Sequence, residues 1–376
     1  MKKLYREVNS IKMNKNQFFK RQITLPEIGE VGQQKLQNAS VFVVGCGGLG
    51  SPIAVHLATS GIGKIHLVDF DIIDVSNLHR QVFYELDDVG KPKAEILSKF
   101  IEKRTPFTKV TFSNNPVTKE NVFELIENAD IVVDGTDSLP TKYLLNDACV
   151  IKNKSLVYGS LYKFDGYVAS FNIEQKDGTY SANLRDAFPK MATDVPNCEE
   201  AGTLNSIVSL IAAQQVNEVL KLITGIGKPL INKLLIYNSL QNSQLKMKLT
   251  SLDSCHSERQ RRISEIFKNE TYFDASCETQ NSEWLISAQD LKNEMSGRAE
   301  SRPIVISVTE NLQTPFKVDK EISLTDLNKA FFKPESNMKY VFVCEQGIKS
   351  YTATSLLKQQ YPNSKIVSLT GGIFKF

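Results

Sequence analysis

The feature that most constrains the fold is a glycine-rich turn between an apolar strand and a helix-like segment. Residues 40–45 read SVFVVG, and Gly45, Gly47 and Gly50 then follow the spacing G-x-G-x-x-G, with Gly48 as an additional glycine. In a βαβ unit, backbone amides at the start of such a helix can bind phosphate oxygens. The sequence therefore predicts a Rossmann-like nucleotide-binding domain, but the glycines alone do not identify the nucleotide.

The alternation of apolar strands and amphipathic helices predicts an α/β fold with a mainly parallel sheet. After Lys154, two β-rich runs joined by KFDG predict antiparallel strands added to that sheet. Residues 174–202 are polar and contain two prolines, which predicts a long crossover loop. A strong amphipathic helix and a hairpin-like pair follow.

Composition divides the chain into four parts. We expect an N-terminal extension at 1–17, an adenine-nucleotide domain at 18–250, a charged linker at 251–283 and a small α/β domain at 284–376. The last part has its own alternation of helices and strands over about 90 residues, which is enough for an independent domain. The predicted architecture is thus a Rossmann-like sheet plus a second, smaller α/β domain.

Charge and residue usage exclude several classes of partner. With 45 basic and 42 acidic residues, the chain has no broad field to attract nucleic acid or a membrane. It has no apolar run of about 18 residues, and its basic start, where Met1 or Met13 could initiate, lacks a signal-peptide core. Its six cysteines form no C-x-x-C pair, which favours reduced thiols. We therefore expect a cytoplasmic protein.

Acidic and basic side chains follow the second predicted strand. Asp69 lies 24 residues after Gly45, where a carboxylate can accept hydrogen bonds from ribose hydroxyls. The run after it contains further polar candidates, namely Asp71, Asn77, Arg80, Gln81 and, in GKPK, Lys93. Arg80 and Lys93 could neutralise the negative charge of a triphosphate. The pyrophosphate of a dinucleotide would require such cations less strongly. The alternative is that both are ordinary surface cations.

A third strand end carries Thr136 and Asp137, directly after the apolar run ADIVVDG. Open parallel sheets bind ligands at this edge. A carboxylate among phosphate-binding cations indicates a metal ion, and Mg²⁺ is the ion that suits carboxylate plus phosphate oxygens. The alternatives are that Asp137 is a helix N-cap, or that the domain is a nicotinamide-dependent oxidoreductase, which needs only the glycines and Asp69.

Taken in this order, the motifs resemble those of the MoeB/ThiF/HesA adenylyltransferases, relatives of ubiquitin-activating enzymes. The resemblance covers about residues 18–249 and rests on G-x-G-G-x-G, D-F-D with S-N-L-x-R-Q, G-x-P-K and T-D. It implies that ATP adenylates the C-terminal Gly-Gly of a ubiquitin-fold sulfur carrier, of MoaD or ThiS type, for molybdopterin or thiamine synthesis. The carrier's carboxylate is itself the nucleophile, so the enzyme chiefly supplies positioning and charge neutralisation.

The resemblance also implies roles for individual residues. Asp69 would bind the ribose, Asp137 would bind Mg²⁺, and the phosphate contacts would be Asn77, Arg80, Gln81 and Lys93. Arg21, in KRQI, would reach ATP from the neighbouring subunit, which implies a homodimer with composite sites. A cysteine desulfurase is a candidate sulfur donor.

Two positions depart from the family pattern. Relatives commonly hold zinc with two C-x-x-C pairs, but the corresponding runs here read YSANLRDAFP and LDSCHS, leaving Cys255 and His256. Because two ligands do not make a tetrahedral site, we expect no zinc, and a crossover loop that is fixed by packing or mobile. Lys142 replaces a family arginine and so lacks the planar guanidinium fork.

Two cysteines of the first domain have different predicted roles. Cys198 matches a family cysteine that, in ThiF-like members, captures the activated carrier or joins sulfur transfer. The following helix favours its thiolate, although Glu199 and Glu200 oppose it, and an inert loop cysteine is the alternative. Cys46, inside the glycine turn, is predicted to be a packing residue.

The C-terminal part places Cys344 at the end of the apolar strand VFVC, before the turn EQGIKS and a helix. Amides of this turn and Lys349 would stabilise a thiolate or persulfide. With SLTGGIFKF, residues 284–376 resemble a rhodanese-type sulfurtransferase domain, whose loop cysteine carries persulfide sulfur. Ser307 stands where many rhodaneses have an acid. The alternative is a non-catalytic docking module.

Overall fold

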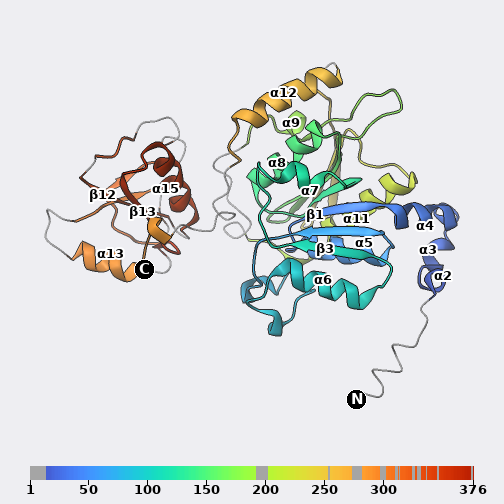
Figure 1. The fold of residues 1–376 in the computed structure, drawn as a ribbon, viewed down its shortest axis with the longest axis horizontal. Helices are drawn as coiled ribbons and strands as arrows, with labels where there is room; N and C mark the ends of the chain where they lie inside the picture. Colours follow the sequence, from blue (N-terminus) through green and yellow to red (C-terminus); the bar gives the residue numbers. More distant parts are fainter. Residues whose placement is uncertain are drawn as a thin grey trace, which may run out of the picture. The chain divides into compact units, whose positions relative to one another are not determined.

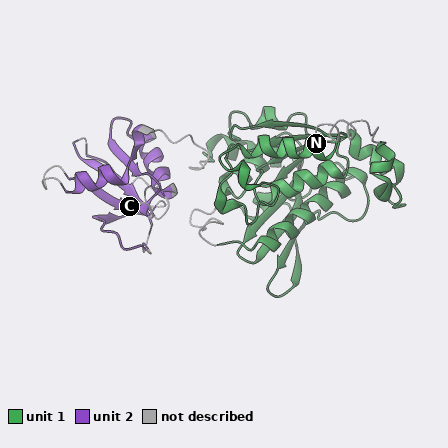
Figure 2. Cartoon of the chain, turned by 90° about the horizontal axis from the view of Figure 1, so that it is seen from below, with its two compact units in different colours: residues 1–191, 195–272 green, residues 192–194, 273–376 purple. Residues whose placement is uncertain are grey.

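The chain forms two compact units in a computed structural model (Figure 2). Unit 1 comprises residues 1–191 and 195–272, and unit 2 comprises residues 192–194 and 273–376. The structure describes residues 14–191, 202–252, 255–272 and 282–296, and, from 302 to the C-terminus, all residues except 310–311, 313, 324–326, 328–331, 336, 345–346 and 374–375. Each unit is described by itself.

Unit 1 is built on an eight-stranded sheet in the order β3-β2-β1-β4-β5-β6-β7-β8 (Figure 1). The strands are β1 (Ser40–Val44), β2 (Lys64–Val68), β3 (Lys109–Ser113), β4 (Ile131–Asp134), β5 (Ser155–Tyr162), β6 (Asp165–Phe171), β7 (Lys233–Asn238) and β8 (Ser243–Lys248). The first five strands in this order are parallel, and β6, β7 and β8 join them antiparallel. The predicted Rossmann-like sheet with added antiparallel strands is confirmed.

Helices cover both faces of this sheet (Figure 1). They are α2 (Lys15–Phe18), α3 (Lys20–Ile23), α4 (Gly29–Asn38), α5 (Gly50–Thr59), α6 (Lys93–Arg104), α7 (Val122–Ile126), α8 (Leu139–Ile151), α9 (Leu184–Ala187), α11 (Asn205–Thr224) and α12 (His256–Asn269), with 3₁₀ turns η1 (Val75–Asn77) and η2 (Leu86–Asp88). Val41 and Val43 of β1 belong to the core with α5, α6 and α11, whereas Phe42 and Val44 belong to the core with α7, α8 and α12. The apolar run of β1 therefore reflects burial on both faces, as in parallel sheets generally.

The 20-residue helix α11 is long and apolar enough to cross a membrane by length and composition alone. In unit 1, however, its residues Ile207, Val208, Ile211 and Val219 are buried in the core. Gly166 of β6 lies so close that a Cβ there would meet Cγ1 of Ile211 at 2.2 Å. The apolar face of α11 is thus accounted for by its packing on the sheet.

The segment expected to be a linker, 251–283, instead contains the 14-residue helix α12, which packs against α8 and belongs to unit 1. The helix forms because Arg259, Ile263 and Phe267 recur at a spacing of four residues and are all buried. Apart from Arg259 and the half-buried Arg262, its charged residues are exposed, which is why the segment reads as polar in the sequence.

A buried ionic network joins α8, α9 and Tyr272, which lies three residues after the end of α12. Asp147 of α8 accepts hydrogen bonds from Arg185 Nε at 2.9 Å and Nη2 at 2.7 Å, and from the Tyr272 hydroxyl at 2.5 Å. Asp147 and Arg185 are 0% and 3% exposed. Nearby, Arg259 Nη1 donates to the Ser181 carbonyl at 2.6 Å. The described part of the expected crossover loop is therefore held by specific contacts, with α9 and a short bridge between Glu174 and Tyr180.

Unit 2 contains a five-stranded sheet in the order β11-β10-β12-β13-β9, parallel throughout. Its elements are η3 (Ser282–Trp284), β9 (Leu285–Ile286), α13 (Ala288–Met295), β10 (Ile304–Ser307), β11 (Lys320–Glu321), β12 (Lys339–Val343), α15 (Ile348–Gln360) and β13 (Lys365–Leu369). Apolar clusters lie on both faces of this sheet, one containing Ile306 and Phe342 and the other Val305 and Val341. The predicted small α/β domain thus has its own core.

We expect Asp147→Ala to lower the stability of unit 1 by about 3–5 kcal/mol, because Arg185 would remain buried without its partner. Unfolding by urea should be followed by circular dichroism, to which unit 1 contributes most, and by fluorescence of Trp284, the chain's one tryptophan, which lies in unit 2. The circular dichroism transition should move to lower urea and the Trp284 transition should stay. Glu124→Ala, at an exposed position of α7, is the control. If both substitutions lowered the stability of unit 1 equally, the buried ionic network would not have the stabilising effect expected of it.

Candidate functional site

The loops that follow β1 and β4 are packed against each other at the carboxyl edge of the sheet. Gly45 has φ +85°, and a Cβ there would meet the Gly135 carbonyl oxygen at 2.8 Å. A Cβ on Gly50, the first residue of α5, would lie 1.7 Å from the Gly45 carbonyl oxygen. Gly45 N also donates to Val68 O of β2, and Gly135 N donates to Val44 O of β1. Glycine is required here because two backbone segments touch.

Asp69 lies under this turn, immediately after β2. Its carboxylate accepts hydrogen bonds from the backbone amides of Cys46 at 2.6 Å and Asp71 at 2.8 Å, and the residue is 9% exposed. Burial raises the pKa of Asp69 to about 6, although Lys93 and the two amides oppose that shift. Asp69 is therefore ionised at neutral pH, with capacity to accept further hydrogen bonds.

Lys93 begins α6 and points back to the same place. Its Nζ lies 2.9 Å from the carboxylate of Asp71, and its side chain is 7% exposed while that of Asp71 is 52% exposed. Burial lowers the pKa of Lys93, but Asp69, Asp71 and Asp137 together outweigh burial and raise the pKa. The site thus holds a buried, charged ammonium group whose ion-pair partner, Asp71, is exposed.

Cys46 and Tyr84 pack behind the turn. The Tyr84 hydroxyl donates to the Cys46 carbonyl at 2.7 Å, and both residues are buried. Burial raises the pKa of the Cys46 thiol well above its usual value, and Asp69 adds to this effect. Cys46 therefore stays protonated and behaves as the predicted packing residue.

The segment 77–81 supplies a second wall of the site. Asn77 and Gln81 are buried at 7% and 4% exposure, and Gln81 Nε2 lies 3.4 Å from where a Cβ on Gly47 would be. Gln81 Oε1 is buried and has no hydrogen-bond partner within the described residues. The half-buried Arg80 lies beside the place of a Gly48 Cβ, 3.8 Å away, and donates to Ser76 O and to His79 Nε2.

The loop after β4 presents Asp137. Thr136 donates from both its amide and its hydroxyl to Asp134 Oδ1 at 3.0 Å, which fixes the loop, and Asp137 itself is exposed. The negative charge of Asp137 adds to the effects of Asp69 and Asp71 that raise the pKa of Lys93. The structure thus brings together the glycine turn, Asp69, Asp71, Lys93 and the T-D pair.

A second candidate site lies in unit 2, at the carboxyl end of β12. Cys344 is 3% exposed, and its Sγ accepts hydrogen bonds from the amides of Gly347 at 3.1 Å and Ser350 at 3.4 Å. Gly347 has φ +88°, and a Cβ there would meet Gly372 N at 2.7 Å. The T-G-G turn after β13 therefore packs directly on the cysteine loop. Ser307, at the end of the neighbouring strand β10, is fully buried and bonded to Thr309.

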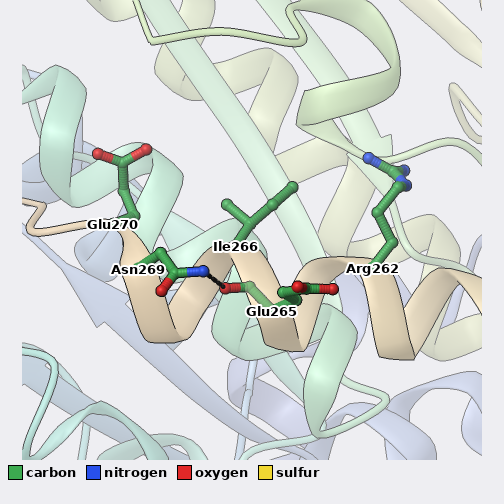
Figure 3. A pocket seen from close by; sticks show the side chains of 5 residues that line it. All are labelled: Arg262, Glu265, Ile266, Asn269 and Glu270. Atoms are coloured by element: carbon green, nitrogen blue, oxygen red, sulfur yellow. Dashed lines mark hydrogen bonds between the residues drawn. The ribbon is translucent and has the colours of Figure 1, made fainter.

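A surface pocket of about 340 Å³ lies elsewhere in unit 1 (Figure 3). It is lined by residues of α12 and its C-cap, namely Arg262, Glu265, Ile266, Asn269 and Glu270. Its polar groups are partly engaged within the fold, since Asn269 donates to the Glu265 carbonyl and Arg262 pairs with Asp186. It contains none of the predicted nucleotide-binding residues.

Most of unit 1 matches a known protein family. A family model described as "ThiF family" matches residues 19–257. The chain belongs to the ThiF family.

Relatives of this ThiF-family chain extend the match into unit 2. A sulfur carrier protein adenylyltransferase of Thermus thermophilus is 41% identical over 239 residues, covering 63% of this chain and 88% of that protein. A probable molybdopterin-synthase adenylyltransferase of Porphyra purpurea is 30% identical, and the match covers 94% of this chain and 91% of that protein. The adenylyltransferase and sulfurtransferase MOCS3 of Drosophila sechellia is 31% identical, and the match covers 94% of this chain and 81% of that protein. A crystal structure of E. coli MccB with ATP is 26% identical, with a TM-score of 0.52 over 60% of this chain and 68% of that one.

Other predicted residues of this ThiF-family chain are not joined to the site by the structure. Arg21 is exposed on α3, which packs against α4, so its action on a neighbouring subunit stays a prediction. Cys198 lies outside the described residues. Cys255 is exposed and contacts Ser257, while the His256 ring stacks on Tyr180 with ring centroids 4.2 Å apart. Among the described residues no group of three or more metal-binding side chains occurs, and the expected absence of zinc stays a prediction.

The sequence did not reveal that the ammonium group of Lys142 holds the loop after β4. Lys142, which stands in place of a family arginine, is 3% exposed and points into the protein. Its Nζ donates to Asp134 Oδ2 at 2.9 Å and to the carbonyls of Thr136 at 2.6 Å and Gly159 at 2.7 Å. All three protons of the ammonium group are used, so Lys142 is a positioning residue. The acid at the end of the run IVVD was the available signal, because a buried strand rarely ends in an unpaired carboxylate.

We expect Gly50→Ala to lower the stability of unit 1 by at least about 2 kcal/mol and to abolish nucleotide binding, because the methyl group would overlap the Gly45 backbone. Gly47→Ala is the matched control: its methyl would meet only Gln81 Nε2, at 3.4 Å, and should cost less than about 1 kcal/mol. Thermal unfolding and ATP titration measure both effects. A stable Gly50→Ala protein with normal ATP affinity would contradict the packing described for the turn.

Proposed function

We propose that this ThiF-family chain uses ATP and Mg²⁺ to adenylate the C-terminal Gly-Gly carboxylate of a ubiquitin-fold sulfur carrier. The observation that supports this most is the joining of a glycine turn, an ionised Asp69 and a buried Lys93 at one edge of the sheet. The names of the relatives supply the carrier and the reaction. The relative from Porphyra purpurea, which matches nearly the whole chain, makes a MoaD-type carrier the first to test, with a ThiS-type carrier second.

The residues present fit an adenine nucleotide. A Cβ at Gly45 or Gly50 would overlap backbone, so the conformation of the turn requires glycine there. Gln81 Oε1 beside the turn has no hydrogen-bond partner within the described residues and is a buried acceptor that a donor group of a ligand could satisfy. Asp69 would accept hydrogen bonds from the ribose hydroxyls. Asn77, Arg80 and Lys93 would contact the phosphates, and a phosphate would compete with the exposed Asp71 for the ammonium group of Lys93.

Mg²⁺ would be held by Asp137, which is exposed at the loop after β4 and electrostatically coupled to Lys93. One carboxylate plus phosphate oxygens is a usual ligand set for this ion. When bound, Mg²⁺ supplies neutralisation of phosphate charge. Lys142 and Thr136 hold the backbone of this loop, so Asp137 is presented by a rigid support.

The chain's residues would catalyse the reaction by position and charge. The ionised carrier carboxylate attacks the α-phosphorus and diphosphate leaves, with no proton to remove from the nucleophile. Lys93 and Arg80 offset the charge that develops on the leaving diphosphate. A nicotinamide-dependent oxidoreductase would leave the buried cation of Lys93 and the exposed carboxylate of Asp137 without a purpose, and no contact in the described site favours it over adenylation.

Unit 2 would deliver sulfur to the activated carrier. Cys344 sits on amide donors suited to an anionic sulfur, and the MOCS3 relative that spans 94% of this chain is named a sulfurtransferase. A persulfide on Cys344 would attack the acyl-adenylate and displace AMP, which leaves an acyl disulfide between the carrier and Cys344. A thiol would then cleave this S–S bond, releasing the carrier thiocarboxylate and forming a disulfide with Cys344 that a second thiol would reduce. The tether between the units raises the local concentration of the persulfide nucleophile. A cysteine desulfurase would recharge Cys344. We further propose a cytoplasmic homodimer in which Arg21 completes the partner's nucleotide site.

Exchange of labelled diphosphate into ATP tests the first half-reaction. We expect exchange that depends on a MoaD-type or ThiS-type carrier, and a loss of more than about 100-fold in Asp137→Ala and Lys93→Met. Lys91→Met is the matched control, because Lys91 is half exposed and pairs only with Asp88 on the surface; its effect should stay below about twofold. Exchange with neither carrier, or full activity of Lys93→Met, would rule out the proposal.

Formation of the carrier thiocarboxylate tests the second half-reaction. We expect Cys344→Ser to retain carrier-dependent diphosphate exchange and to lose thiocarboxylate formation from a persulfide donor, measured by the mass of the intact carrier. Ser364→Ala serves as control, since Ser364 is half-buried in unit 2 and, among the described residues, its hydroxyl donates to the Tyr361 carbonyl alone. Undiminished thiocarboxylate in Cys344→Ser would instead support a docking role for unit 2.

A further inference from the structure

The cysteine loop of unit 2 is backed by two buried hydroxyl groups that the proposed function does not use. Ser350, in the first turn of α15, and Ser368, on β13, are both 0% exposed. The Ser368 hydroxyl donates to Ser350 Oγ at 2.9 Å. The Cys344 thiol donates to the same Ser350 Oγ at 3.5 Å. The three side chains form a continuous line from the core of unit 2 to the reactive sulfur.

Ser350 is fully engaged while Cys344 is a thiol. Its hydroxyl donates to the Gly347 carbonyl at 3.0 Å, and its oxygen accepts from Ser368 and from Cys344. A hydroxyl has one proton and two lone pairs, so this arrangement uses all of them. When Cys344 loses its proton, the bond from sulfur to Ser350 disappears, and the buried anion requires donors instead.

Two donors to sulfur are already in place, the amides of Gly347 and Ser350. A third is available if the Ser350 hydroxyl turns from the Gly347 carbonyl to the sulfur. Ser368 can remain donor to Ser350 throughout. Its bond polarises the Ser350 hydroxyl and makes it a stronger donor, because hydrogen bonds in a chain reinforce one another.

We propose that Ser368 is a positioning residue for sulfur chemistry at Cys344: by donating to Ser350 it holds the Ser350 hydroxyl in place to turn to an anionic sulfur. The proposal rests on the sulfur-transfer part of the proposed function. In that reaction the Cys344 proton goes to solvent, and the thiolate attacks the outer sulfur of a donor persulfide. The donor's S–S bond breaks, a new S–S bond forms on Cys344, and the donor leaves as a thiolate, so no oxidant is needed.

The rate at which iodoacetamide alkylates Cys344 in the full chain, followed against pH, tests this role. Mass spectrometry of the tryptic peptide 340–349 isolates Cys344 from the other cysteines, and the exposed Cys255 is an internal reference. In Ser350→Ala we expect the pH of half-maximal rate to rise by about one unit, the size expected when one hydrogen bond to a charged group is lost. Ser368→Ala should raise it by about half as much, with the maximal rate unchanged. Lys349 is retained in all variants, so the charge beside the loop is constant.

The double variant of Ser350 and Ser368 shows whether Ser368 acts through the Ser350 hydroxyl or only through packing. We expect Ser368→Ala to add little once Ser350 is alanine, because Ser368 acts through the Ser350 hydroxyl. Thr354→Val is the matched control: Thr354 is a fully buried α15 residue whose hydroxyl has no hydrogen-bond partner within the described residues, and its pH profile should equal the wild type. Trp284, whose ring lies 6.3 Å from that of Tyr351 on α15, reports whether unit 2 stays folded.

An unchanged profile in Ser368→Ala, or a full additional shift in the double variant, would overturn the proposal. If Trp284 emission shows that Ser368→Ala unfolds unit 2, Ser368→Cys preserves the size of the side chain with a weaker donor. It should then shift the profile in the same direction, and no shift would count against the relay. Alkylation needs no ATP, carrier or sulfur donor. If Ser368→Ala shifts the pH profile but wild-type Cys344 transfers no sulfur, the proposed sulfur transfer is contradicted and the positioning role of Ser368 is not.

Discussion

The candidate site of unit 1 depends on one buried carboxylate. Asp69 binds the amides of Cys46 and Asp71, so it ties the turn after β1 to the end of β2, and it also attracts Lys93 from the start of α6. Burial raises the pKa of Asp69 to about 6, which means that its ionised form carries a cost in the folded chain. Lys93 and the two amides offset that cost. Three separate elements are thus held in register by a group that the ligand itself would also use.

Much of this could be predicted from the sequence, because the relevant signals are local. The spacing of Gly45, Gly47 and Gly50 defines the turn, and the apolar runs before Asp69 and Gly135 define the strand ends. Parallel strands bring their carboxyl ends together, so residues far apart in sequence were expected at one edge. The rhodanese-like part followed from the same logic, with Cys344 after a buried strand and a glycine in the turn.

What the sequence did not reveal depends on pairings across long separations. In the sequence, Lys142 stands out only as a replacement for a family arginine. Its ammonium group in fact binds Asp134 and two backbone carbonyls inside the protein, and no periodicity indicates which way a lysine side chain turns. The segment 251–283 was taken as a linker because charged residues dominate it. Its three inward residues, Arg259, Ile263 and Phe267, are too few to outweigh that composition, and one of them is an arginine whose burial depends on the distant Ser181 carbonyl.

The contact between Tyr272 and Asp147 fixes where the first unit ends. Tyr272 is the last described residue before the stretch that leads to unit 2, and its hydroxyl is bonded inside the core of unit 1. A truncation at residue 250 would therefore remove α12 and leave the apolar surface of α8 and the Arg185 pair open to water. Anyone isolating the adenylating half for crystallisation or for binding work should keep the chain through Tyr272, since the boundary suggested by composition cuts through the folded body.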